Sequence, residues 1–419
     1  MRWIVATVAP LLAAGLLVSI GSPSRSDELV QVDQRAAEVG CVAARSVEPV
    51  PAPTGPSWFA IRLGFDHAAG LSQGVGQLIA VLDTGVVEVP AIVGAVRPAI
   101  DLLQVPVTDA AMPTADNTTD EADCDGRGTA MAGLIAASRG PGAELPGLAR
   151  AAQILPIRVT ATANDPPEPG VLAMGLDAAV AAGATVALVG SAVRDDPALL
   201  GATVAALDAG VAVVAAAGDG DDQALAFPAG YDGVISVAAT GRQDDPRAVN
   251  AVGRVTVAAP GADLLGFGLT GDFVTGLGGS AYAAALVAAT VADLRATHPE
   301  LTPANLRQRL IATADRPGVA VPDPAVGWGV INPVTALTAP TTDAGPTPAS
   351  AAVASPAVVV DLPPEAVDNS WSITIAGLLL TLAGGIAAVV SGVRLAARRR
   401  WRPATDRPPA EPAATDPVH

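Results

Sequence analysis

The chain of 419 residues contains no lysine, so arginine supplies all 24 of its basic residues. They stand against 41 acidic residues, and the formal net charge is −17 at pH 7. This balance argues against nucleic acid as a partner, because binding to phosphates requires clustered positive charge. The acidity can also serve solubility alone.

Aromatic residues are scarce at 3%, whereas 50% of the residues are hydrophobic. A sizeable core must therefore consist of alanine, valine, leucine and isoleucine, in one large domain or two ordinary ones. Histidine is scarcer still, with only His67, His298 and His419. Few positions can thus supply an imidazole for catalysis.

Cys41 and Cys124 are the only cysteines of the chain. Two cysteines in an oxidising compartment predict one disulfide. This disulfide would tie an N-terminal segment to the loop "DCDGRG" at residues 123–128. Two free thiols are the alternative.

Residues 1–24 have the pattern of a secretory signal peptide. Arg2 gives a basic start, an apolar run extends from Ile4 to Ile20, and small residues followed by charge come next. This order is typical of a segment that directs secretion and is then removed. An N-terminal anchor that is not cleaved is the alternative.

The stretch from Ile373 to Val393 contains no charged residue and is long enough to span a bilayer as a helix. Several arginines follow at once, between Arg394 and Arg402, and the positive-inside rule places them in the cytoplasm. We therefore predict a transmembrane helix at 372–393 in the cell membrane, a cytoplasmic tail at 394–419 and a main domain outside the membrane. A buried core helix is the alternative.

Residues 76–340 alternate between short apolar runs and helical patterns. The runs predict strands at 78–82, 184–189, 211–217 and 233–239, and the helical patterns lie at 172–183, 199–210, 280–298 and 302–314. This alternation predicts an α/β fold with a doubly wound parallel sheet and flanking helices. The polar, proline-containing residues 25–75 are interpreted as an extension that wraps the core, and 341–371 as a Pro/Ala/Thr linker.

The segment "AVLDTGV" places Asp83 at the carboxyl end of a predicted strand, where α/β proteins hold ligand-binding residues. Asp-Thr-Gly also occurs in aspartic proteases, which need two such carboxylates sharing a proton. Here Val86 follows the glycine and no second copy exists. The motif therefore does not indicate an aspartic protease.

The order of the motifs resembles the subtilisin-like serine proteases, the peptidase S8 family. "AVLDTGV", "DGRGTAMAGLIAA", "VAVVAAAGD" and "GSAYAAALVAA" follow one another in the order of that family. The segment "PSWFAIRLGFDHAAGLSQGVGQLIAVLDTGV" and the two chain ends are most similar to the mycosins, the membrane-anchored subtilases of type VII secretion. The resemblance implies a subtilisin-like fold, no cofactor or metal, and type VII membrane core components as partners.

The catalytic positions depart from this family. Its aspartate orients a histidine that takes the proton of a serine, and an asparagine completes the oxyanion hole. Carried over position by position, Asp83 retains the aspartate, Arg127 stands at the histidine position and Ala281 at the serine position. Asp219 stands at the oxyanion asparagine, and Ser280, one residue early, is a poor substitute nucleophile.

These replacements remove the chemistry. Arginine stays protonated in proteins and cannot act as a general base, and alanine offers no nucleophile. A buried carboxylate needs a partner, so we predict that Arg127 forms an ion pair with Asp83, with Asp219 as a second candidate partner. An Arg127 that points into solvent is the alternative.

The sequence therefore favours a pseudoprotease that stabilises a type VII secretion membrane complex. The alternative is an active serine endopeptidase that processes type VII substrates. A third, weaker alternative is a module that binds peptides in the former substrate cleft. The strand "VALVGS" argues against it, because the family pattern has Asn and Ser there.

Overall fold

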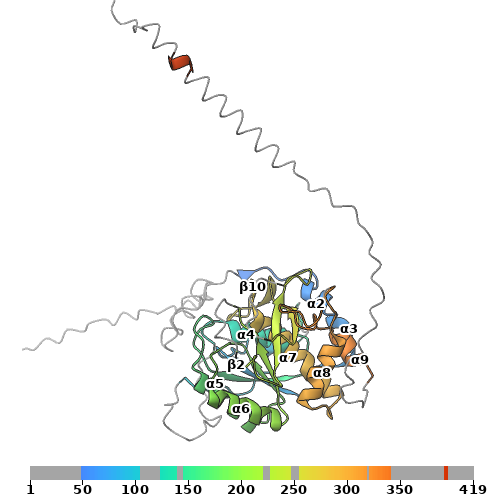
Figure 1. Cartoon of the computed structure of the whole chain (residues 1–419). Helices are drawn as coiled ribbons and strands as arrows, with labels where there is room; N and C mark the ends of the chain where they lie inside the picture. The colour runs from blue at the N-terminus through green and yellow to red at the C-terminus, as the bar shows by residue number, and fades with distance from the viewer. Residues whose placement is uncertain are drawn as a thin grey trace, which may run out of the picture. The chain divides into compact units, whose positions relative to one another are not determined.

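The structure is a computed structural model that describes residues 49–103, 123–138, 145–219, 227–246, 254–318, 320–340 and 391–394 (Figure 1). The chain divides into two compact units, Met1–Thr341 and Thr342–His419, each considered by itself. The first unit contains all of the labelled helices and strands.

Seven parallel strands form the central sheet of the first unit, in the order β3-β4-β2-β5-β6-β7-β8. Their bounds are β2 Leu78–Asp83, β3 Ile100–Asp101, β4 Gln153–Arg158, β5 Val186–Val189, β6 Ala212–Ala216, β7 Ile235–Thr240 and β8 Val257–Pro260. Parallel strands covered on both faces read as continuous apolar runs, which explains why four of the seven could be predicted. The predicted doubly wound parallel sheet is confirmed.

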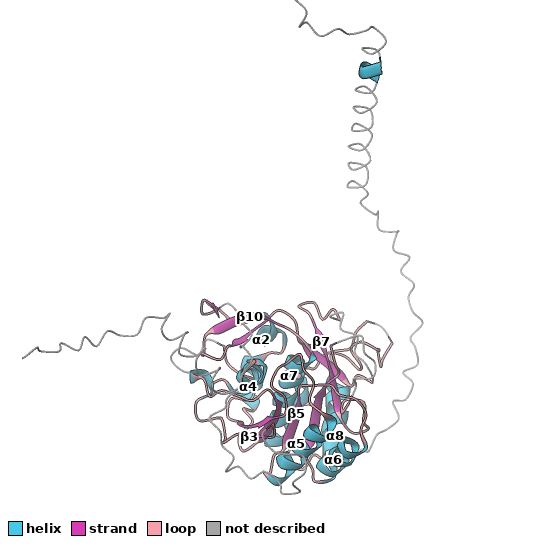
Figure 2. Cartoon of the chain, turned by 90° about the vertical axis from the view of Figure 1, so that its left-hand side faces the viewer, coloured by secondary structure: helices cyan, strands magenta, loops and turns pink. Residues whose placement is uncertain are grey.

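Helices cover both faces of this sheet (Figure 2). Successive strand residues point to opposite faces, so Val81 of β2 joins one core cluster and Leu82 the other. Two helices pack on the Leu82 side, α5 Pro169–Ala181 and α6 Pro197–Asp208. The Val81 side is covered by α3 Phe65–Leu71, α4 Arg127–Ala136, α7 Ser280–Thr297, α8 Pro303–Thr313 and α9 Pro333–Thr338.

The long helix α7 lies at the centre of the Val81 side. It is buried from Ser280 to Leu294 and packs against α4 and strands β5 to β8. Its many alanines suit this position, because small side chains allow a close approach to the sheet at native packing density. The predicted helix at 280–298 is confirmed.

Several helices begin or end at the capping residues that the sequence predicts. The Thr302 side chain accepts a hydrogen bond from the Asn305 N–H at 3.2 Å and caps α8. Helices α5 and α6 are followed by Gly183 (φ 75°) and Gly210 (φ 86°), both in the left-handed region that glycine tolerates. The predicted glycine stops of both helices are confirmed.

The described part of the N-terminal segment is built into the core. β1, Pro49–Val50, pairs antiparallel with β10, Phe273–Leu277, which pairs with β9, Leu264–Phe267. Helix α2, Trp58–Arg62, and α3 bury Phe59 and Phe65 in the core cluster that contains α7. The sequence predicts neither this small sheet nor the two helices.

The predicted chain ends lie almost entirely outside the described residues. This holds for the signal peptide at 1–24, the first part of the extension at 25–75, the linker at 341–371 and the tail at 394–419. Of the predicted span at 372–393, the structure describes residues 391–393, which are helical. Within the described part of the chain, no helix combines the length and apolar character needed to cross a membrane.

The buried carboxyl group of Asp293, in α7, is expected to make the stability of the protein depend on pH. Its side chain is fully buried, and neither carboxyl oxygen accepts a hydrogen bond from the described residues. Burial raises its pKa from 3.8 to about 7, which outweighs the opposing effects of nearby Ser72, Gly74 and Arg150. The folded state therefore binds more protons than the unfolded chain between these two values, so this group's contribution to stability is lost as pH rises through about 7.

We expect Asp293→Asn to remove this pH dependence, which amounts to about 1.4 kcal/mol per pH unit within the window. The variant should match the wild type below about pH 4, where the carboxyl group is protonated in both states, and should exceed its free energy of unfolding near pH 8. Thermal or denaturant unfolding at several pH values measures the effect. The exposed Asp232→Asn is the control, and parallel curves for wild type and Asp293→Asn would contradict the prediction.

Candidate functional site

The candidate site lies at the carboxyl ends of two neighbouring strands. Asp83 is the last residue of β2, and Gly190 and Ser191 directly follow β5, which pairs with β2. The chain fills the sheet on one side of β2 with β3 and β4, then crosses to the other side with β5. This is a topological switch point, where open α/β sheets form their ligand-binding crevice.

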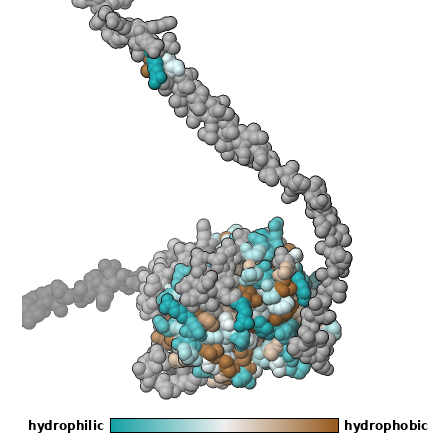
Figure 3. Space-filling view, viewed as in Figure 1, coloured by the Kyte–Doolittle hydropathy of each residue, from teal (hydrophilic) through white to brown (hydrophobic). Residues whose placement is uncertain are grey.

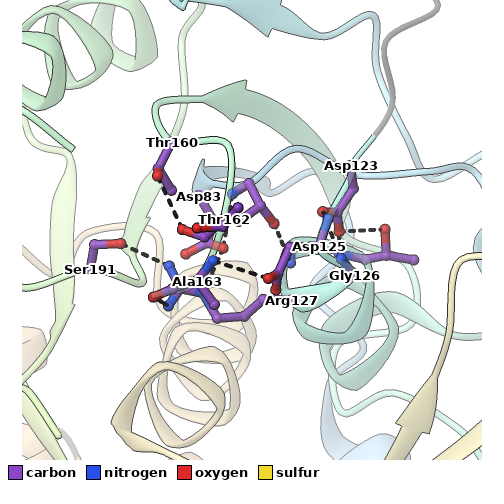
Figure 4. Close-up of polar contacts among 12 residues, drawn as sticks. Asp83, Asp123, Asp125, Gly126, Arg127, Thr160, Thr162, Ala163 and Ser191 are labelled. Atoms are coloured by element: carbon purple, nitrogen blue, oxygen red, sulfur yellow. Dashed lines mark hydrogen bonds and ion pairs between the residues drawn. The ribbon is translucent and has the colours of Figure 1, made fainter. Parts of the chain in front are cut away.

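Arg127, the first residue of α4, extends its guanidinium into this crevice (Figure 4). Its Nε donates to Asp83 Oδ1 at 2.8 Å. Its Nη2 donates to the Ser191 hydroxyl at 2.8 Å, and its Nη1 to the Ala163 carbonyl at 3.0 Å. One side chain therefore connects β2, the end of β5 and the loop that follows β4.

The ion pair of Arg127 and Asp83 is buried, with side-chain exposures of 11% and 0%. Burial on its own would lower the pKa of Arg127, but the negative charge of Asp83 and its hydrogen bond raise it above the ordinary value. The guanidinium thus stays charged at any physiological pH. The predicted pairing with Asp83 forms in the structure, and Arg127 does not point into solvent.

The second oxygen of Asp83 faces glycine. Asp83 Oδ2 has no hydrogen-bond partner among the described residues. A Cβ atom added at Gly190 would come within 2.0 Å of this oxygen. The position of Asp83 therefore requires that residue 190 has no side chain, which explains the glycine in the motif "VALVGS".

The entry into α4 is fixed by a second carboxylate. Asp123 is buried, and it accepts hydrogen bonds from the N–H groups of Gly126 and Thr129 at 2.8 Å each. Burial raises the pKa of Asp123, although these bonds act in the opposite direction. Gly126 takes the left-handed conformation (φ 95°), and a Cβ at Gly128 would lie 1.9 Å from the Gly85 carbonyl oxygen. Both glycines beside Arg127 are thus demanded by backbone geometry.

Asp125 and Arg127, the two neighbours of Gly126, both hold the loop that follows β4. The Ala163 N–H donates to Asp125 Oδ2 at 3.1 Å, while its carbonyl accepts from Arg127. The Thr160 hydroxyl bonds the carbonyls of Thr162 and Asp165 and closes the turn internally. Asp125 and Ala163 are not among the predicted site residues, although two aspartates before a helix start are a recognisable N-terminal pattern.

Asp219 and Ser280 meet at the start of α7. Both carboxylate oxygens of Asp219 accept from the Ser280 backbone N–H, at 2.7 and 2.9 Å. The Ser280 hydroxyl oxygen accepts from the Gly218 N–H at 3.2 Å, and its side chain is buried, as is that of Ala281. Within the described part of the chain no ion pair joins Asp219 to Arg127, so this second predicted pairing is not formed. Asp219 instead neutralises the positive end of α7.

These residues border one cleft of about 280 Å³, lined on its walls by Arg127, Ser191, Asp219 and Ser280 and by the loop residues Asn164 and Pro166. None of the residues that line it is a histidine. His67 lies in α3 and His298 follows α7, and His419 is outside the described residues. Among the described residues, no group of three or more His, Cys, Asp or Glu side chains is placed to hold a metal ion.

A second buried ion pair joins the ends of β3 and β4 and was not predicted. Arg158, the last residue of β4, contacts Asp101 of β3 at 3.1 Å, with side-chain exposures of 7% and 5%. Its other Nη atom lies 3.4 Å from the sulfur of Cys124, which is buried. Cys41 lies outside the described residues, so the disulfide with Cys124 stays a prediction.

A parallel sheet with an aspartate at the end of β2, a glycine-flanked helix start beside it and a long buried helix behind it defines a subtilisin-like α/β protein. The profile of the subtilase family, peptidase S8, matches residues 74–329, and the chain belongs to this family.

Several relatives are mycosins. Mycosin-1 of Mycobacterium tuberculosis is 31% identical over 397 residues, which cover 80% of this chain and 84% of the relative. A crystal structure of MycP1 with the N-terminal propeptide removed is 28% identical, with a TM-score of 0.59, and the match covers 68% of this chain and 98% of that one. The resemblance to the mycosins that the sequence predicts is confirmed.

A further similar structure is the periplasmic assembly from the ESX-5 inner membrane complex. The matching chain in it is 25% identical, with a TM-score of 0.61. The match covers 73% of this chain and 90% of that one.

We expect Arg127→Ala to lower the free energy of unfolding by about 3–5 kcal/mol, because it leaves a buried carboxylate without its cation. Adding Asp83→Asn to this variant should recover part of the loss, since the uncompensated charge is then gone. Denaturant unfolding of the full chain measures both changes.

The matched control is Arg254→Ala. Arg254 also pairs with an aspartate, Asp232, but both side chains are largely exposed, at 84% and 93%. Such pairs contribute little, so this control should leave the stability nearly unchanged. Equal losses in Arg127→Ala and Arg254→Ala would refute the assignment of a stabilising role to the buried pair.

Proposed function

We propose that this chain is a membrane-anchored, mycosin-like pseudoprotease with a structural role in a type VII secretion membrane complex. The observation that carries the proposal is the Arg127 guanidinium. It occupies the space beside Asp83 and is held there by three hydrogen bonds. Acyl transfer needs a neutral base at such a place, and a permanently protonated guanidinium cannot accept a proton.

The remaining groups of the cleft give no substitute chemistry. A serine becomes a nucleophile when an adjacent base takes its proton. The Ser280 hydroxyl is buried and oriented by the Gly218 N–H, and Asp219 is engaged by the backbone of α7. A carboxylate beside the start of α7 also opposes the negative charge that a tetrahedral intermediate develops.

The relatives support the structural part of the proposal. The matches include mycosins and a chain within the periplasmic assembly of the ESX-5 inner membrane complex. A scaffold in such an assembly needs the fold, its surfaces and an anchor, but no working triad. The predicted signal peptide at 1–24 and membrane helix at 372–393 fit this location outside the cytoplasm.

We expect the purified full chain to remain unlabelled by a fluorophosphonate probe that reacts with activated serines. A catalytically competent subtilisin, treated in parallel, is the positive control. Gel fluorescence and mass spectrometry measure the labelling. Labelling of the wild type that disappears in Ser280→Ala would show an active serine and support the endopeptidase alternative.

We also expect the tagged full chain to co-purify with type VII membrane core components from its native membrane. Deletion of residues 372–419 should abolish this recovery, because the predicted anchor is then missing. Ser280→Ala should leave it intact, since the proposed role requires no catalysis. Absence of the core components from the wild-type sample would refute the scaffold proposal.

A further inference from the structure

Helices α5 and α6 lack the polar outer face that a surface helix normally has. Helix α6 reads "PALLGATVAALD", and its single internal polar residue, Thr203, is buried and bonds the Leu199 carbonyl. Helix α5 reads "PGVLAMGLDAAVA", with Asp177 as its only charged residue. Helices that cover a sheet in water are ordinarily apolar on one side only. The outer sides of these two helices therefore call for an explanation.

The outward residues of α6 form an exposed apolar row. Leu200 is 42% and Val204 46% exposed, and they stand four residues apart on the same side of the helix. Gly201 and Ala205, beside them, are exposed and small. Their size leaves room for the backbone of another helix to come close.

Helix α5 packs side by side with α6 and extends this surface. Its partly buried Val171, Met174 and Val180 lie at the outer edge of the Leu82-side core. Figure 3 shows hydrophobic side chains grouped low on the visible face, where Figure 1 places α5 and α6. We name the outward residues of both helices, centred on Leu200 and Val204, the α5–α6 face.

The rim of the α5–α6 face is acidic. Glu168 precedes α5, Asp196 precedes α6, Asp177 lies within α5, and Asp208 ends α6. Between Arg158 and Arg242 the sequence contains a single basic residue, Arg194. An apolar centre whose helices carry acidic residues as their only charged side chains favours partners of the opposite sign.

We propose that the α5–α6 face is a docking surface for an apolar helix of another protein that carries arginine or lysine at its flanks. A second copy of this chain does not fit, because its own acidic rim would oppose this one. An anionic lipid surface is disfavoured for the same reason. A helix laid along Gly201 and Ala205 would bury Leu200 and Val204 and place its basic residues against Asp177 and Asp208.

The proposal is tested by photo-crosslinking of the full chain in its native cells. A benzophenone amino acid replaces Val204, and the control site is Val93, which is 66% exposed and lies far along the sequence from both helices. We expect about tenfold more protein adduct from position 204 than from 93, because a helix docked on the α5–α6 face lies within reach of the probe at 204 only. Mass spectrometry of the adduct should map it to an apolar segment flanked by arginine or lysine.

The charge requirement is tested in the same cells. Asp177→Arg with Asp208→Arg should lower the adduct from position 204, whereas the exposed Asp232→Arg should not. An adduct with a second copy or with lipid, a partner segment without basic flanks, or equal yields at 204 and 93 would each overturn the proposal. The comparison of adduct yields at sites 204 and 93 tests the docking surface by itself, without the charge variants. A partner outside type VII secretion would support this surface while counting against the proposed function.

Discussion

The buried ion pair of Asp83 and Arg127 is the interaction on which the arrangement of the site depends. Asp83 ends the strand next to the switch point of the sheet and is fully buried, so it requires a positive partner. A guanidinium has more donors than one carboxylate can use, and here the others hold Ser191 and the Ala163 carbonyl. The charge of Asp83 thereby fixes β2, the end of β5 and the loop after β4 in one place.

Much of the surrounding fold could be predicted because it follows from local pattern. The apolar runs that end at Asp83 and Val189 are long enough to indicate buried strands, and Thr302 and Gly183 mark helix ends directly. The Asp83–Arg127 contact could be predicted for an energetic reason, since a carboxylate at a buried strand end needs a cation. The strand and helix-end inferences are local, whereas the choice of Arg127 as the cation also rests on the family resemblance, which places it at the position of the histidine beside the aspartate.

The features that escaped prediction depend on contacts between distant segments. β1 is two residues long, and its pairing with β10 spans more than two hundred residues of sequence. The Ala163 carbonyl carries no sequence signal at all, because any residue could supply it. The sequence also offers Asp219 as a partner of Arg127, but Asp219 accepts a hydrogen bond from the Ser280 N–H at the start of α7 instead. The charge of Asp219 alone does not reveal whether the Arg127 guanidinium or the Ser280 N–H lies nearer to it.

The three bonds of Arg127 also decide what another residue at this position could do. A histidine has two ring nitrogens on a shorter side chain, so it could not serve Asp83, Ser191 and the Ala163 carbonyl together. Arg127→His would therefore leave the loop after β4 or the end of β5 without its present support. The same guanidinium that neutralises Asp83 thus also acts as a cross-brace between three segments, so the residue at position 127 sets the local architecture of the site as well as its charge.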